Sequence, residues 1–267
     1  MSAELFDMKL RALRRDRAAR TGSDPFLHER AFEDCLDRLS LIQRDFASAL
    51  IVGCPDPSWP DRLRKFVPAV EVVDPGVLFA EAAGGSQVIE DSWTPDPATH
   101  DLCIAVGTLD TVNALPNALL AMRFLLREEG LLLGAMSGGE TLPQLRSAMR
   151  AADEVRRAAA PHVHPRIEPA ALAGLLSTAG FEMPVVDVDR VQVSYAHLCG
   201  LVADLRAMGA TNILSQRSKV PLSRSAYSAA VESFARSSVD GRVKESFEIL
   251  HFAGWTAGST GPLVKHD

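Results

Sequence analysis

The chain has 267 residues, of which 47% are hydrophobic and 23% charged, a profile typical of globular proteins and not of fibrous or disordered ones. Its formal net charge of -6 lacks the basic surplus with which general nucleic-acid binders neutralise phosphates, so no nucleic-acid partner is predicted. Four scattered cysteines without a Cys-x-x-Cys pair indicate neither a disulfide framework nor a zinc site.

The apolar segments are too short to predict a membrane span. The longest candidates are interrupted by Arg123 or Arg127, whereas a spanning helix needs an apolar stretch of about 18 residues or more. The N-terminus also lacks the pattern of a signal peptide. These features predict a cytoplasmic protein.

Apolar periodicity predicts helices that alternate with short strands. Helices are expected at residues 5–19, 26–42, 115–126, 142–159, 168–179, 196–208 and 225–236. Strands are expected at residues 47–52, 69–73, 87–89, 102–106, 131–136, 181–188, 191–195 and 246–255. This alternation predicts an α/β fold with one sheet of about seven mostly parallel strands, helices on both faces, and an antiparallel last strand at or near one edge.

The domain organisation follows from the positions of the helices. No linker or repeat divides the chain, so residues 1–267 are expected to form a single domain. Residues 1–45 would be an N-terminal helical extension, because they precede the first strand. Residues 196–240 would be a helical insertion before the last strand, and we expect it to pack over the strand ends as a lid.

The N-terminal helix carries a run of basic residues: Lys9, Arg11, Arg14, Arg15, Arg17 and Arg20. Their spacing sets several positive charges along one helix, which is the local exception to the missing basic surplus of a nucleic-acid binder. A basic helix is weak evidence alone, so a solvated helix face is the favoured interpretation.

Four predicted strands end in residues suited to a ligand site. Gly53 ends the first strand, Asp74 the second, Glu90 and Asp91 follow the third, and Gly107 follows the fourth. In an open parallel sheet, ligands bind outside the carboxyl ends of the strands, and an acid about 20 residues after the first turn binds ribose. Each residue alone also suits a turn or a cap, but together they predict a nucleotide-type pocket.

Several segments resemble the family of bacterial and mitochondrial complex I assembly factor five. They are Phe6-Asp7 before the basic helix, Gly53-Cys54, residues 134–142 with Leu145-Arg146, and Met208-Gly209-Ala210-Thr211-Asn212. That family has a class I S-adenosylmethionine (SAM) methyltransferase fold and is similar to the malonyl-carrier-protein methyltransferases of biotin synthesis. Its mitochondrial member is regarded as hydroxylating an arginine of a complex I subunit, so fold and reaction separate.

The resemblance implies SAM as cofactor and a protein side chain or carrier-bound acid as substrate, with a complex I subunit as one candidate partner. It implies no particular catalytic residue. The implied cofactor residues are Gly53 and Cys54 in the first loop, Asp74 and Pro75 at the ribose, Asp91 and Ser92 near the adenine, and Val106 and Gly107 along the cofactor.

Two segments depart from the family pattern. The first loop reads Gly53-Cys54-Pro55-Asp56-Pro57 in place of Gly-Cys-Gly-x-Gly, and proline removes both glycine conformations and an N–H donor. Residues 109–113 read Leu-Asp-Thr-Val-Asn in place of Leu-His-Trp-Val-Asn. The alternative hypothesis is therefore a non-catalytic assembly or binding protein that has kept the fold and lost the cofactor.

The remaining candidates have weaker patterns. His162 and His164 lie two residues apart with no third ligand in sequence, so a structural role in a loop is favoured over a metal site. Ser137 precedes two glycines, but no Gly-x-Ser-x-Gly motif surrounds it. The glycine pair is interpreted as a tight turn beside the substrate.

Overall fold

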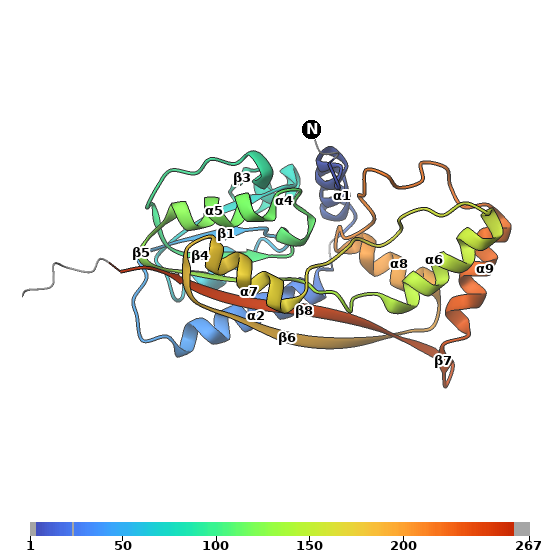
Figure 1. Cartoon of the computed structure of the whole chain (residues 1–267). Coiled ribbons are helices and arrows are strands. Elements are labelled where there is room, and N and C mark those ends of the chain that lie inside the picture. Colours follow the sequence, from blue (N-terminus) through green and yellow to red (C-terminus); the bar gives the residue numbers. More distant parts are fainter. Residues whose placement is uncertain (1–3, 23, 259–267) are drawn as a thin grey trace, which may run out of the picture.

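A computed structural model describes residues 4–22 and 24–258 (Figure 1). The helices are α1 (Met8–Thr21), α2 (Phe26–Leu41), α3 (Trp59–Leu63), α4 (Val77–Ala82), α5 (Leu115–Leu125), α6 (Pro143–Arg156), α7 (Pro169–Thr178), α8 (Leu198–Ala207) and α9 (Arg224–Ala235). The strands are β1 (Ser48–Val52), β2 (Ala69–Asp74), β3 (Ser86–Gln87), β4 (His100–Val106), β5 (Leu126–Ser137), β6 (Phe181–Tyr195), β7 (Ser238–Val239) and β8 (Arg242–Thr256).

The strands form one mixed sheet in the order β3-β2-β1-β4-β5-β8-β6, with β7 paired to β8. Neighbours from β3 to β5 are parallel, and β8 is antiparallel to both β5 and β6. The predicted α/β fold with an antiparallel last strand near one edge is confirmed. Residues 181–195 form one strand, because β8 pairs with both predicted halves. The short helices α3 and α4 and the short strand β7 were not predicted.

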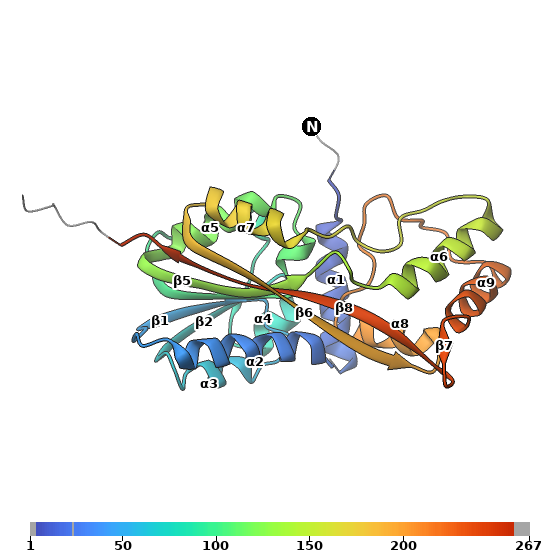
Figure 2. The same cartoon turned by 60° about the horizontal axis from the view of Figure 1, so that its bottom comes forward.

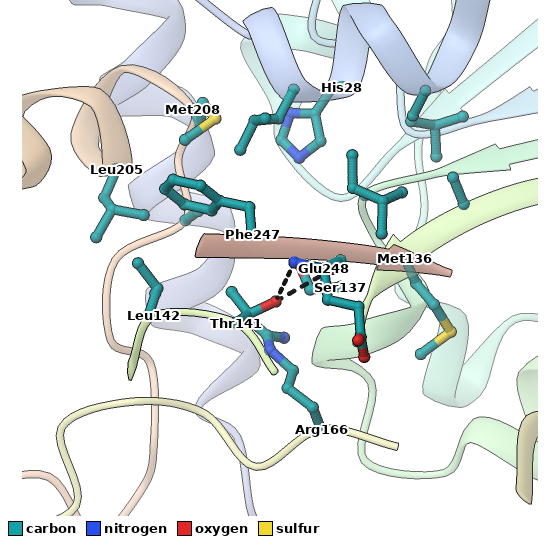
Figure 3. Close-up of a pocket in the computed structure, with 17 residues that line it drawn as sticks. His28, Met136, Ser137, Thr141, Leu142, Arg166, Leu205, Met208, Phe247 and Glu248 are labelled. Carbon is teal, nitrogen blue, oxygen red and sulfur yellow. Dashed lines mark hydrogen bonds between the residues drawn. The ribbon is translucent and has the colours of Figure 1, made fainter. Parts of the chain in front are cut away.

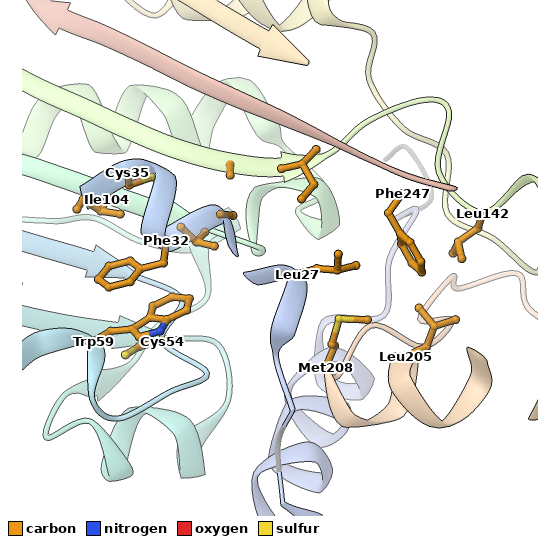
Figure 4. Close-up of a cluster of buried hydrophobic side chains, with 14 of the residues drawn as sticks. Leu27, Phe32, Cys35, Cys54, Trp59, Ile104, Leu142, Leu205, Met208 and Phe247 are labelled. Carbon is orange, nitrogen blue, oxygen red and sulfur yellow. The ribbon is translucent and has the colours of Figure 1, made fainter. Parts of the chain in front are cut away.

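Helices cover both faces of the sheet (Figure 2), α2 and α3 on one face and α5 and α7 on the other. Alternate residues of β1 serve the two cores: Ile51 packs on the α2 side, and Leu50 and Val52 on the α5 side. This two-sided burial explains why the central strands read as continuous apolar runs. On the α2 side, Phe32 stacks on Trp59 with ring centroids 4.2 Å apart (Figure 4).

The antiparallel pair β6–β8 is longer than the parallel strands, with 15 residues in each strand. It runs from the parallel sheet to a second group of helices, α6, α8 and α9, and α1 lies between the two parts (Figures 1 and 2). The core cluster on the α2 side continues into this group through residues such as Leu142, Leu201 and Phe234. That the segment 196–240 acts as a lid stays a prediction.

Among the described residues, no helix has both the length and the apolar character needed to cross a membrane.

Candidate functional site

Asp74, the acid expected at a ribose, is fully buried at the end of β2 and is bonded by the chain itself. Its Oδ1 accepts from Arg15 Nε at 2.8 Å and from the Gly76 amide at 2.7 Å. Its Oδ2 accepts from Arg15 Nη2 at 2.5 Å and from the Cys54 amide at 2.7 Å. A carboxylate has about four lone-pair sites, so Asp74 has no acceptor left for a ribose hydroxyl.

Arg15 reaches this position because α1 packs across the strand ends. Asp7 caps the helix by accepting from the Leu10 amide at 2.9 Å, which fixes where α1 begins. One turn before Arg15, the buried Arg11 binds Glu90 with both terminal nitrogens, at 2.6 and 2.9 Å, and donates to the Thr108 carbonyl at 2.8 Å. Although burial opposes it, the charge of Asp74 raises the pKa of Arg15 above its ordinary value.

His28, on α2, occupies the space above the end of β4. A Cβ added to Gly107 would lie 2.4 Å from the His28 ring, and a Cβ on Gly53 would lie 2.6 Å from the Val106 carbonyl oxygen. Both glycines have positive φ, +85° at Gly53 and +65° at Gly107. They therefore let the loops approach closely, but the space they open is filled by protein atoms. Burial lowers the pKa of His28 to about 4, and its Nδ1 has no described partner.

The first loop is packed in the same way. Cys54 and Pro55 are buried, and burial raises the pKa of the Cys54 thiol, which leaves it protonated and unsuited to be a nucleophile. The Trp59 ring stacks on Phe32, and its Nε1 donates to Glu29 at 2.6 Å. The Gly53 amide donates to the Val73 carbonyl at 2.8 Å, and the Cys54 amide donates to Asp74 at 2.7 Å. Pro55 and Pro57 have no N–H to offer a ligand, and the Trp59 ring is buried.

Asp91 and Ser92 lie apart from this group. The Asp91 carboxylate accepts from the amides of Asn113 and Ala114 and from the Asn113 side chain, at 2.8 to 3.2 Å. Both residues line a cleft of about 850 Å³ along a different face of α1. Of the predicted cofactor residues, the structure thus brings together Gly53, Cys54, Asp74, Pro75, Val106 and Gly107, and places Asp91 and Ser92 elsewhere.

A small cavity remains beside His28, at the ends of β4 and β5 (Figure 3). Its volume is about 50 Å³, far below the roughly 300 Å³ at which small-molecule pockets begin. Thr141 closes one side, because its hydroxyl donates to the Glu248 carbonyl at 3.1 Å and accepts from the Glu248 amide at 3.0 Å. The arrangement therefore does not fit SAM held through Asp74.

Asp110, which replaces the family histidine, forms a buried ion pair with Arg166. Although burial opposes ionisation, the charge of Arg166 holds the pKa of the Asp110 carboxyl below its usual value. His164 accepts from the Ile213 amide at 3.0 Å, and His162 contacts Asp153 at 3.0 Å. The structural role predicted for the two histidines agrees with these contacts.

The segments that carry the family resemblance hold α1 in place. The Phe6 amide donates to Asn113 Oδ1 at 2.8 Å, and the Asp7 amide to the Ile213 carbonyl at 2.9 Å. A Cβ added to Gly209 would lie 3.4 Å from Arg15 Cα. Sequence reasoning missed Arg11 and Arg15 as site residues. Their i, i+4 spacing was the available signal, since it sets both on one helix face.

The glycine pair, Gly138-Gly139, lies at the turn after β5. The Gly138 amide donates to the Glu248 carbonyl at 2.8 Å. A Cβ on Gly138 would lie 2.5 Å from the Glu248 carboxylate, and one on Gly139 would lie 2.4 Å from Glu168 Oε1. The chain turns at residues 139–140, as predicted, and each glycine lies against the end of a glutamate side chain.

Sequence comparisons agree with the fold. A family profile described as "Methyltransferase domain" matches residues 26–185. The chain is similar to the mitochondrial arginine-hydroxylase NDUFAF5 of Danio rerio, with 31% identity over 272 residues that cover 94% of this chain and 82% of that protein. It is also similar to the malonyl-[acyl-carrier protein] O-methyltransferase of Xylella fastidiosa, with 30% identity over 171 residues that cover 64% of this chain and 56% of that protein.

Solved structures share the architecture at low sequence identity. The YcgJ protein of Bacillus subtilis superposes with a TM-score of 0.56 at 8% identity, covering 85% of this chain and 98% of that chain. A phosphoethanolamine N-methyltransferase of Haemonchus contortus in complex with S-adenosyl-L-methionine gives 0.51 at 12% identity, covering 85% and 52% of the two chains. At these identities the likeness concerns the fold alone.

Proposed function

Because the chain belongs to the methyltransferase-domain family, among the relatives of the mitochondrial arginine-hydroxylase NDUFAF5 proteins, we propose that it is an assembly or binding protein with a closed cofactor site. Its partner would be a protein, with a subunit of respiratory complex I as the first candidate. The fold would supply a rigid frame that presents α1 and the helices around β6–β8 to this partner.

The observation that carries the proposal is that the Asp74 carboxylate accepts four hydrogen bonds, two of them from Arg15. For SAM to reach Asp74, α1 would have to leave the strand ends. That movement would separate two buried ion pairs, Arg15–Asp74 and Arg11–Glu90. Breaking one buried pair costs about 3 to 5 kcal/mol when a charge is left uncompensated.

A second candidate function is SAM-dependent modification of a protein side chain or a carrier-bound acid. Asp74 and Gly107 favour it, because they stand at the strand ends where such folds bind nucleotides. In that case α1 would open before the cofactor enters. The relatives include an arginine hydroxylase and a carrier-protein O-methyltransferase, which support both substrate classes.

Calorimetric titration with SAM and S-adenosylhomocysteine distinguishes the two functions. The binding-protein proposal expects no heat and no change in melting temperature. A ligand at 100 times its dissociation constant would stabilise the fold by about 2.7 kcal/mol. A clear upward shift with either compound would therefore overturn the closed site and favour the enzyme.

The partner is tested in the source cells by deleting the gene. We expect less assembled complex I, while mass spectrometry finds the same mass for the arginines of its subunits as in the parent strain. Loss of one oxygen or one methyl group from a subunit would instead identify an enzyme. Fractionation of the same cells tests the proposed cytoplasmic location, since the NDUFAF5 relatives are named as mitochondrial.

A further inference from the structure

The outer face of α1 contributes to a cationic cleft, which is distinct from the strand ends. Six cationic side chains from four segments line this cleft of about 490 Å³: Arg14, Arg17, Arg156, Arg206, Arg217 and Lys219. They come from α1, the end of α6, α8, and the loop between α8 and α9. No acidic residue belongs to the described lining. In a chain with net charge -6, such a concentration of positive charge is unexpected.

Most of these cations are not neutralised by the protein. Only Arg217 and Arg156 have acidic neighbours in the described part of the chain, Asp7 at 3.3 Å and Asp153 at 4.0 Å. Burial and the neighbouring charges of Arg17, Arg217 and Arg206 lower the pKa of Arg14. A structural cluster would contain carboxylates, as the inner face of α1 does.

Several polar atoms in the cleft are buried and have no hydrogen-bond partner within the described residues. They are Arg14 Nε, Arg17 Nη2, Arg156 Nη1 and Thr211 Oγ1. Each such atom costs free energy unless a partner satisfies it. Guanidinium groups match phosphate oxygens in geometry and charge. The unused donors therefore fit an anionic ligand.

The cleft adjoins an apolar cavity of about 380 Å³ between α6, α8 and α9. His162, Val202, Arg206, Thr211, Asn212 and Leu222 line both spaces. Beyond them the cavity is bounded mainly by apolar side chains, including Leu145, Met149 and Leu198. Its volume lies within the range of small-molecule pockets. One ligand could thus place a charged group in the cleft and an apolar chain in the cavity.

We propose that these two adjoining spaces together bind an amphipathic phosphate, with the phosphate held by Arg14, Arg17 and Arg206 and the apolar chain enclosed beside Val202. The ligand is either a soluble phosphorylated metabolite or the headgroup and chain of a membrane lipid, since both have this chemistry. The site is separate from the closed strand ends, so it does not depend on SAM binding.

Octyl phosphate tests the proposal as a probe, kept below its aggregation limit in calorimetry with the full chain. We expect it to bind at least tenfold more tightly than inorganic phosphate or octanol. Across butyl, hexyl and octyl phosphate, each added methylene should tighten binding up to about fourfold. Equal affinity for inorganic phosphate and octyl phosphate would show that the cavity does not enclose the apolar chain.

Matched variants locate the site. Arg14→Gln/Arg17→Gln should weaken octyl phosphate binding at least tenfold, whereas Arg20→Gln/Arg236→Gln changes the net charge equally at exposed positions and should not. Val202→Trp should block the cavity, while Ala203→Trp, at the exposed neighbouring position on α8, should leave binding intact. If the α1 variant does not fold, Arg206→Gln, at an exposed position on α8, replaces it. Equal losses in variants and controls would refute the site.

Vesicles separate the two sources of ligand. Phosphatidylcholine vesicles containing phosphatidic acid should recruit the protein if the ligand is a membrane lipid, and the Arg14→Gln/Arg17→Gln variant should stay unbound. Binding of octyl phosphate without recruitment to vesicles would assign a soluble metabolite. If neither probe binds, the proposal is wrong.

Discussion

The two faces of α1 carry the same residue type but differ in what surrounds it. On the inner face, Arg11 and Arg15 are buried against Glu90 and Asp74. On the outer face, the guanidinium of Arg14 meets other cations and an open cleft. Because an α-helix has 3.6 residues per turn, Arg11 and Arg15 lie on one face of α1 and Arg14 lies on another.

The basic helix is therefore not one functional feature. Its inner arginines fix the helix to the strand ends and occupy the acid that a nucleotide-binding fold would use. Its outer arginines retain donors for a ligand. If the inner face is structural and the strand ends are closed, changes on the two faces should have different effects.

The largest effect is expected from Arg15→Ala, because it leaves the fully buried Asp74 carboxylate without its cation. The free energy of unfolding should fall by about 3 to 5 kcal/mol. Arg14→Ala on the outer face should change it by only about 0.5 kcal/mol. Urea denaturation of both variants measures the difference. Similar losses in the two variants would end the distinction between the faces.

The next largest effect is expected from low pH, which should reduce the free energy of unfolding through His28. The pKa of His28 falls from 6.5 to about 4 on folding, so the unfolded chain binds more protons between these values. Stability is therefore fully present above about pH 6.5 and declines as the pH falls towards 4, by about 3 kcal/mol for this group. His164 has a similar pKa. Because both histidines contribute, the test compares the free energy of unfolding of wild type and of His28→Leu across a pH series. Parallel curves for the two proteins would contradict the predicted contribution of His28.

Gly107→Ala should cost less, about 1 to 3 kcal/mol, because the new methyl group meets the His28 ring and the residue has positive φ. If His28 fills this space, His28→Ala in the same chain should recover part of the loss. Thermal or urea unfolding of the two single variants and the double variant gives the coupling. If the free-energy changes of the two single variants simply add in the double variant, the His28 ring does not fill the space beside Gly107.

The smallest expected effect concerns the first loop. Pro55→Gly/Pro57→Gly restores its glycines, yet SAM should still not bind, because Arg15 continues to occupy Asp74. Calorimetric titration of this variant and wild type provides the comparison. Micromolar binding by the variant alone would mean that the loop, and not α1, closes the site.

Most of the fold could be predicted from local patterns. The strand expected at residues 102–106 is observed as β4, and the helix expected at 115–126 as α5. The short helices α3 and α4 were missed, since five or six residues give too little periodicity. The predicted break between residues 188 and 191 is absent because β8 pairs without interruption with residues 185–195 of β6.

The order of helices and strands, the α/β class, and the acids and glycines at the strand ends can be inferred from the sequence, because they depend on local periodicity and turn chemistry. The pairing of charges depends on how the helices pack in three dimensions. Arg15 and Asp74 are 59 positions apart, and Arg14 meets Arg206 and Arg217 across three segments. Helix packing alone turns one arginine inward to a buried carboxylate and its neighbour outward to a cationic cleft.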